Sequence, residues 1–241
     1  MTIYEERALQ ELLAWKREVS KKPSIVNRVT KGIQRKANNL MPEKAQFIIT
    51  EAVKNMAKAV IVGSEFITRE PLRNTLLEER EKQVSEKLDF YRKAAVVEGA
   101  GTGAGGLFLG LADFPLLLSL KMKFLFDVAA LYGFDVRDYR ERLYILYVFQ
   151  LAFSSRTRQV ELYYQMENWE SFIQKLPSDM NEFDWKTFQQ EYRDYIDLAK
   201  LMQLVPGIGA VVGAYANYKL MDRLGETAMN AYRMRVFKPV V

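Results

Sequence analysis

The sequence predicts an all-α protein, a compact multi-helix bundle of about seven to nine helices around a central glycine-rich helical pair. Apolar residues recur at helical spacing along most of the 241 residues. No segment alternates apolar and polar residues between turn signals, as a half-buried strand would. With 49% hydrophobic and 27% charged residues, the chain has the composition of a globular protein. Because no clear linker interrupts it, we expect a single domain over residues 1–241.

The first helices are predicted from their start and stop signals. Thr2, with Glu5 three residues later, forms a capping box. The run Lys-Lys-Pro ends this helix, and Ser24 begins a short basic helix, so residues 1–44 hold two basic N-terminal helices. Pro42 fits the first position of the next helix. The residues expected on the inward face of that helix are Phe47, Val53, Ala57 and Ile61.

The later helices are predicted from apolar periodicity and from the turns between them. Gly133 suits a helix C-terminal cap, because glycine enters the left-handed backbone conformation without strain. The ranges expected for the helices after the basic region are 42–68, 72–93, 107–132, 138–154, 157–175, 185–204 and 210–235.

The positive charge of the chain is concentrated near its N-terminus. The net charge is +5, yet residues 16–44 alone hold nine basic and two acidic residues. This basic surface suits an anionic membrane, although a merely solvated helix face explains it equally well. No aromatic residue between Trp15 and Phe47 is available to stack on bases, so no nucleic acid is expected as a partner. The residues assigned to the basic surface are Lys21, Lys22, Arg28, Lys31, Arg35 and Lys36.

The absence of histidine and cysteine excludes several kinds of chemistry. The chain contains neither residue, which rules out disulfides, thiolate nucleophiles and imidazole bases. Neither a metal nor a cofactor is expected.

Acidic residues near the N-terminus do not fit a signal peptide, and the mean hydropathy of −0.18 argues against a polytopic membrane protein. We therefore expect a cytoplasmic protein that lies peripherally at the inner face of the cell membrane.

Two glycine-rich segments, 98–110 and 205–213, stand out. Glycine within a helix costs about 1 kcal/mol relative to alanine, so these glycines need a compensating role. Small residues four apart allow helix backbones to approach closely, which predicts two glycine-turn-helix units, 94–133 and 204–235, packed face to face. A glycine hairpin that contacts the membrane is the alternative. The glycines concerned are Gly99, Gly101, Gly103, Gly105, Gly106, Gly110, Gly207, Gly209 and Gly213.

The first segment also matches a nucleotide-binding pattern. Gly101, Gly103 and Gly106 have the spacing of the dinucleotide-binding motif, and residues 94–97 would be its preceding strand. That motif requires a βαβ unit, whereas a long apolar helix is expected here, so the pattern is weak evidence.

Polar residues near the glycine segments form a candidate functional spot. Asp113 lies in an apolar neighbourhood, where it either caps a helix beginning near Pro115 or pairs with a lysine or an asparagine. Asp127 is expected to pair with Lys123 one helical turn away. The candidate spot comprises Asp113, Lys121, Lys123, Asn217, Glu98 and Thr102, and no catalytic residue is assigned.

The segments GAGTGAGGLFLGLADFPLLLSLKMKFLFDVAALYGFD and VPGIGAVVGAYANYKLMDRLGETAMNAY resemble the EcsC family of bacterial proteins. The resemblance covers most of the chain. It implies a non-enzymatic accessory protein at the cytoplasmic membrane face, with ABC transporter subunits or membrane lipid as partners. The family has no established activity and supplies no catalytic residues. The alternative is a hydrolase-type enzyme that uses carboxylate or Ser/Lys chemistry near the glycine-rich segment.

Overall fold

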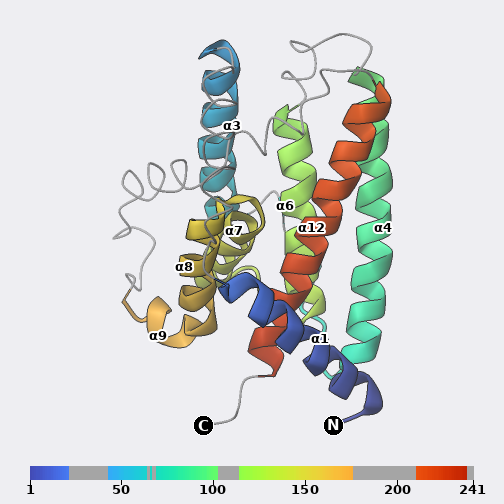
Figure 1. Ribbon diagram of the computed structural model, residues 1–241, viewed down its shortest axis with the longest axis vertical. Helices are drawn as coiled ribbons and strands as arrows, with labels where there is room; N and C mark the ends of the chain where they lie inside the picture. The colour runs from blue at the N-terminus through green and yellow to red at the C-terminus, as the bar shows by residue number, and fades with distance from the viewer. Residues whose placement is uncertain (22–42, 64–65, 67–68, 103–113, 176–209, 238–241) are drawn as a thin grey trace.

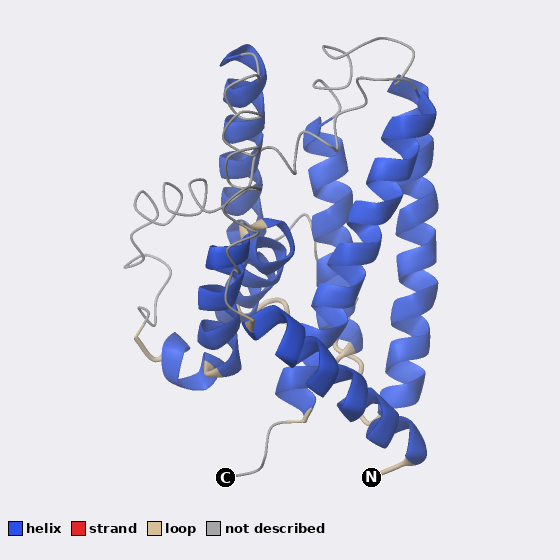
Figure 2. Cartoon of the chain, viewed as in Figure 1, coloured by secondary structure: helices blue, strands red, loops and turns tan. Residues whose placement is uncertain are grey.

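The computed structural model describes residues 1–21, 43–63, 66, 69–102, 114–175 and 210–237. These residues form eight α-helices, and no strand occurs among them (Figure 2). The predicted all-α class and the predicted number of helices are therefore confirmed for the part of the chain that is described.

Three long helices run side by side along the molecule (Figure 1). They are α4 (Leu77–Thr102), α6 (Phe114–Leu131) and α12 (Ala210–Val236). Helix α12 packs most extensively against α4, and both also contact α6. A glycine allows part of this close approach, since a Cβ atom added at Gly225 would lie 2.6 Å from Cδ2 of Leu88.

The remaining helices surround this trio. Helix α3 (Glu43–Val62) packs against α6 and α7 (Tyr139–Phe153), and α7 also packs against α8 (Arg156–Glu167) and α12. The short α9 (Trp169–Ile173) follows α8. Helix α1 (Ile3–Ser20) crosses α12 and contacts α4 and α8 (Figure 1).

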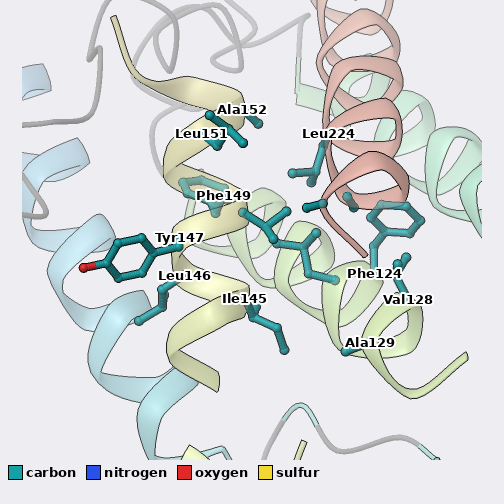
Figure 3. Close-up of a cluster of buried hydrophobic side chains, with 14 of the residues drawn as sticks. Phe124, Val128, Ala129, Ile145, Leu146, Tyr147, Phe149, Leu151, Ala152 and Leu224 are labelled. Atoms are coloured by element: carbon teal, nitrogen blue, oxygen red, sulfur yellow. The ribbon is translucent and has the colours of Figure 1, made fainter. Parts of the chain in front are cut away.

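The hydrophobic core is centred on α6 and α7. Every residue of α7 from Glu141 to Phe153 is buried. Figure 3 shows side chains of α7 meeting those of α6, such as Phe124 and Val128, and Leu224 of α12. A helix buried on all sides has a weakly amphipathic sequence, which is why its inward face is hard to predict.

Two predicted helix ends are confirmed at atomic detail. The backbone N–H of Glu5 donates to Oγ1 of Thr2 at 3.1 Å, and the Glu5 carboxylate accepts from the Thr2 N–H at 2.8 Å, which completes the capping box. After α6, Gly133 has a φ of +91°. The N–H groups of Gly133 and Phe134 close the helix by donating to carbonyl groups of its last turn.

Several predicted boundaries are wrong. Helix α3 ends at Val62 rather than near residue 68, because Gly63 follows in the left-handed conformation, with φ +79°. Phe47, expected to face inward, is 67% exposed. Helix α4 starts later than predicted and continues to Thr102. The single helix expected over 157–175 is two helices, α8 and α9, which meet at Asn168. The helices predicted within 22–42 and over 185–204 lie outside the described residues.

The glycine segments are only partly described. Gly99 and Gly101 lie in the last turns of α4, and Gly213 lies in the first turn of α12. The other six assigned glycines lie outside the described residues, so the central glycine-rich pair stays a prediction. The strand required by the dinucleotide interpretation is contradicted, because residues 94–97 belong to α4.

Candidate functional site

A hollow lies between α1, α4 and α12, and we call it the polar groove. Its volume is about 740 Å³, and it is open to solvent. Helix α1 crosses α12 at this level and forms one wall (Figure 1). The residues lining the groove are Glu11, Ala14, Trp15 and Glu18 of α1, Leu88 and Arg92 of α4, and Asp222, Glu226, Met229, Asn230 and Arg233 of α12.

Helix α12 supplies the floor of the groove through one polar stripe. Its five lining residues are spaced by four, three, one and three positions, so they share one face of the helix. The same helix presents Leu224, Ala228 and Ala231 to the core. Helix α12 is therefore amphipathic: one side lines the groove with mainly polar residues, and the opposite side packs apolar residues into the core.

Beneath the groove, Arg233 forms a two-pronged ion pair with Glu81 of α4. The Arg233 Nε lies 2.7 Å from Oε1 of Glu81, and Nη2 lies 2.6 Å from Oε2. A third guanidinium nitrogen, Nη1, donates to Glu11 of α1 at 2.8 Å. Burial opposes the charge of Arg233, but the hydrogen bonds and negative charge of Glu81 outweigh burial and raise its pKa. Arg233 therefore joins α1, α4 and α12 through its ion pairs with Glu11 and Glu81.

Two tyrosines also donate hydrogen bonds to the Glu81 carboxylate. Tyr132 donates to Oε1 at 2.8 Å and Tyr4 donates to Oε2 at 2.7 Å. Burial, together with the hydrogen bond to Glu81, raises the pKa of Tyr4 to about 12, so both hydroxyls remain donors at neutral pH. With 1% of its surface exposed, Glu81 has its acceptor sites filled by the protein itself, which identifies it as a structural anchor.

Two polar atoms in the groove wall have no hydrogen-bond partner among the described residues. Arg92 donates from Nη1 to Asp89 at 2.7 Å and from Nη2 to Asp222, but its Nε has no acceptor. Asn230 donates from Nδ2 to the Glu226 carbonyl at 2.9 Å, but its Oδ1 accepts nothing. A buried, unsatisfied polar atom costs about 1–3 kcal/mol. Both atoms are inaccessible to solvent, so a ligand in the groove would reach them only after the two side chains had moved.

A smaller hollow lies on the other side of α1. Its volume is about 310 Å³, and it shares Trp15, Glu18 and Glu226 with the polar groove. Lys16 of α1 pairs with Glu167 of α8 at 2.7 Å, and Arg156 donates to the Glu18 carbonyl. These polar contacts hold the second half of α1 against α8, and both hollows border this half of the helix.

The predicted functional spot is only partly described. Lys121 is fully buried, and within the described residues its Nζ donates one long hydrogen bond, 3.5 Å, to the Leu117 carbonyl. Burial lowers the pKa of Lys121 to about 7. Asn217 is also buried, whereas the Lys123 side chain is exposed. Asp113 lies outside the described residues, as do the side chains of Glu98 and Thr102, so the joint site stays a prediction.

The predicted pairing of Asp127 with Lys123 is wrong. Asp127 is 1% exposed and accepts a hydrogen bond from Tyr91 at 3.1 Å. Its ion-pair partners are Lys87 Nζ at 3.2 Å and Arg69 Nε at 3.8 Å. Asp127 faces α4 across the bundle, while Lys123 points to solvent, so the helical spacing alone was misleading.

Of the predicted basic surface, the described part of the chain includes Lys21, which is exposed and pairs with Glu18. Lys22, Arg28, Lys31, Arg35 and Lys36 lie outside it. Among the described helices, none combines the length and the apolarity needed to cross a bilayer. No cluster of three carboxylates that would hold a metal ion occurs in the described ranges.

Sequence reasoning missed the groove and the Glu81 anchor. Glu81 belongs to a charged run, EERE, that is typical of a solvated helix face. The signal that was available is the regular recurrence of Asp222, Glu226, Asn230 and Arg233, which places three charges and an amide on one stripe of the helix.

The fold and the groove together define a class: a helical-bundle protein with a polar groove between three helices. Comparison with known proteins identifies the family, because residues 6–237 match the EcsC protein family, and the chain belongs to it. The chain is 48% identical over 231 residues to Protein EcsC of Bacillus subtilis (strain 168), with 95% of each chain covered. It is also 28% identical over 220 residues to the Uncharacterized protein YdbA of the same organism, covering 82% of this chain and 80% of that relative. No solved structure matches the chain.

Proposed function

We propose that this EcsC family protein is a non-enzymatic accessory protein that acts at the cytoplasmic face of the membrane, where its polar groove binds a subunit of an ABC transporter. One observation carries the proposal: a solvent-open hollow of about 740 Å³ whose lining combines four carboxylates with the apolar side chains of Trp15, Leu88 and Met229. The transporter as partner follows from the family resemblance.

The walls of the groove suit recognition because ion pairs hold them in place. Glu11 and Glu81 fix α1 and α4 to Arg233, and Asp222 fixes α12 to Arg92. A surface that is ordered before binding loses less conformational freedom when a partner arrives. The carboxylates that do this are committed to structural contacts, which favours binding over acid–base catalysis.

The basic surface supports a position at the membrane. Residues 16–44 begin in the last part of α1, the helix that forms one wall of the groove. Each lysine or arginine close to an anionic membrane contributes about 1 kcal/mol. We expect the protein to sediment with anionic vesicles and to be released when Lys21, Lys22, Lys31, Arg35 and Lys36 are changed to glutamate. Sedimentation that is unchanged by this reversal would contradict the basic surface as the anchor.

Site-specific crosslinking in cells tests the partner. A photo-crosslinking amino acid at Ala14, which is exposed in the groove, is expected to capture a transporter subunit that mass spectrometry identifies. The same amino acid at Lys82, exposed on α4 outside the groove, is the control and should not capture it. Absence of any transporter subunit at Ala14, or equal capture at both positions, would overturn the proposal.

The hydrolase alternative is favoured by one observation, the pKa of Lys121, which burial lowers to about 7. An amine with such a pKa is able to act as a general base at neutral pH. This alternative requires a hydrolytic activity that is lost in both Asp113→Asn and Lys121→Met while the fold is retained. An activity that survives both substitutions would eliminate it.

A further inference from the structure

Building on the proposed function, we propose that the polar groove binds a basic segment of the partner polypeptide, one that carries lysine or arginine together with apolar side chains. The transporter subunit would present this segment to Glu226 and to Glu18 of α1. The charge, the chemistry of the wall and the setting of the groove each support a basic peptide.

The charges lining the groove have an acidic excess. Four carboxylates, those of Glu11, Glu18, Asp222 and Glu226, stand against two guanidinium groups. Both guanidinium groups are already neutralised, Arg233 by Glu81 and Glu11, and Arg92 by Asp89 and Asp222. An incoming anion would therefore find no free cation among the described lining residues. An incoming cation would find Glu18 and Glu226, the two lining carboxylates that neutralise neither guanidinium group.

Glu226 is the acid best placed to receive that cation. It is exposed, it lines both hollows, and within the described residues its carboxylate takes part in no ion pair. Glu18 lines the same two hollows, and within the described residues its carboxylate pairs with Lys21, an exposed residue just after α1. Exposed pairs of this kind are weak and are readily exchanged for another partner.

The rest of the wall fits a polypeptide better than a small cation. Trp15, Leu88 and Met229 supply apolar surface beside the acids. A peptide that carries both basic and apolar side chains contacts the acids and this apolar surface together, whereas a simple cation contacts the acids alone.

The positive net charge of the rest of the chain also favours a basic peptide as the ligand of the groove. The chain as a whole has a net charge of +5, so an acidic hollow contrasts with its average surface. Complementary charge steers a partner to the correct surface and suppresses incorrect ones. A basic segment is attracted to the groove and repelled by the basic region of residues 16–44.

Fluorescence anisotropy with the full-length protein tests the inference. The probe is a fluorescein-labelled peptide of alternating lysine and leucine residues, with glutamate–leucine and glutamine–leucine peptides as charge controls. We expect the lysine peptide alone to bind, with an affinity that falls as salt concentration rises. The substitution Glu226→Lys should weaken binding about tenfold or more, because attraction becomes repulsion. Equal binding of the acidic or neutral peptide would overturn the inference.

The matched control is Glu78→Lys, the same change at an exposed glutamate of α4 outside the groove. It should leave peptide affinity within about twofold of the wild type, and thermal unfolding should show that both variants are folded. Equal weakening by both substitutions would mean that overall charge, not the groove, governs binding. Sedimentation velocity adds a further outcome: if Glu226→Lys instead dissolves a dimer, a second copy of the chain occupies the groove and the inference fails.

The two proposals fail in distinguishable ways. Capture of a transporter subunit at Ala14 without binding of the lysine peptide would retain the proposed function and overturn the basic segment as its ligand. Binding of the lysine peptide that depends on Glu226, without capture of a transporter subunit in cells, would retain the chemistry of the groove and overturn the transporter as its partner.

Discussion

Two buried cations, Arg233 and Lys121, show how differently two regions of this bundle hold a charge. Arg233, near the end of α12, has a side chain 6% exposed and contacts two carboxylates, one of which also binds two tyrosines. Lys121, in α6, is fully buried, and within the described residues it has one long hydrogen bond to a carbonyl of its own helix. One charge is neutralised by its neighbours and the other is not.

The chemistry of the two side chains explains the contrast. A guanidinium is planar and stays charged, so it is able to hold two carboxylate oxygens and still reach a third helix. An ammonium is strongly hydrated, and burial without an anion favours its neutral form. Burial accordingly lowers the pKa of Lys121 to about 7, whereas Glu81 raises that of Arg233. The ion pairs of Arg233 hold three helices together, whereas the buried charge of Lys121 lowers the stability of the folded protein.

The largest expected effect comes from removing the anion beside Arg233. Glu81→Gln leaves the guanidinium buried without its main counter-charge, and we expect a loss of about 3–5 kcal/mol in the free energy of unfolding, measured by urea denaturation. The double substitution Glu81→Leu with Arg233→Leu should recover part of that loss, because it removes both charges but leaves the hydroxyls of Tyr4 and Tyr132 without their acceptor. If the single variant were as stable as the wild type, Glu81 would not be the group that neutralises the buried charge of Arg233.

Removing the lone amine should have the opposite sign. Lys121→Met keeps the length of the side chain and eliminates the buried charge, and we expect it to stabilise the protein by about 3 kcal/mol at neutral pH. The unfolded chain holds the lysine proton up to the ordinary pKa of 10.5, whereas the folded protein releases it near 7. Wild-type stability should therefore rise with pH between these values, and the advantage of Lys121→Met should shrink to zero near the upper one.

Urea denaturation at neutral and alkaline pH measures this effect. Lys123→Met, at an exposed lysine two residues along the same helix, is the control and should show no such pH dependence. A Lys121→Met protein that is less stable than the wild type at neutral pH would show that the amine has a stabilising partner, and the contrast with Arg233 would disappear.

The sequence predicts best those features of the fold that depend on a few adjacent residues. The capping box at Thr2 and the cap at Gly133 were predictable, because each depends on a few adjacent residues. The end of α3 at Gly63 and the break at Asn168 were missed, since apolar periodicity continues across both. Periodicity reports which residues are apolar, but not where backbone geometry stops a helix.

The site was harder to predict than the fold because its contacts join distant parts of the chain. The carboxylate of Glu81 meets residues 77, 51 and 152 positions away, namely Tyr4, Tyr132 and Arg233. No single-sequence pattern pairs such residues, so a buried anchor has the same appearance as a solvated charged helix. Lys121 is predicted only as a possible partner of Asp113, and that pairing stays a prediction; the structure shows that Lys121 is buried within α6.

The smallest expected effect sharpens the comparison by removing one hydrogen bond from the Arg233 region while leaving every charge in place. Tyr4→Phe deletes the hydroxyl that donates to Glu81 at 2.7 Å, but Arg233 and Tyr132 still satisfy the carboxylate and Glu11 still ties α1 to α12. We therefore expect a loss of about 1 kcal/mol in the free energy of unfolding. Tyr164→Phe, at a tyrosine that is 52% exposed, should change nothing. A loss in Tyr4→Phe as large as that in Glu81→Gln would show that the attachment of α1, rather than charge neutralisation, holds this region together.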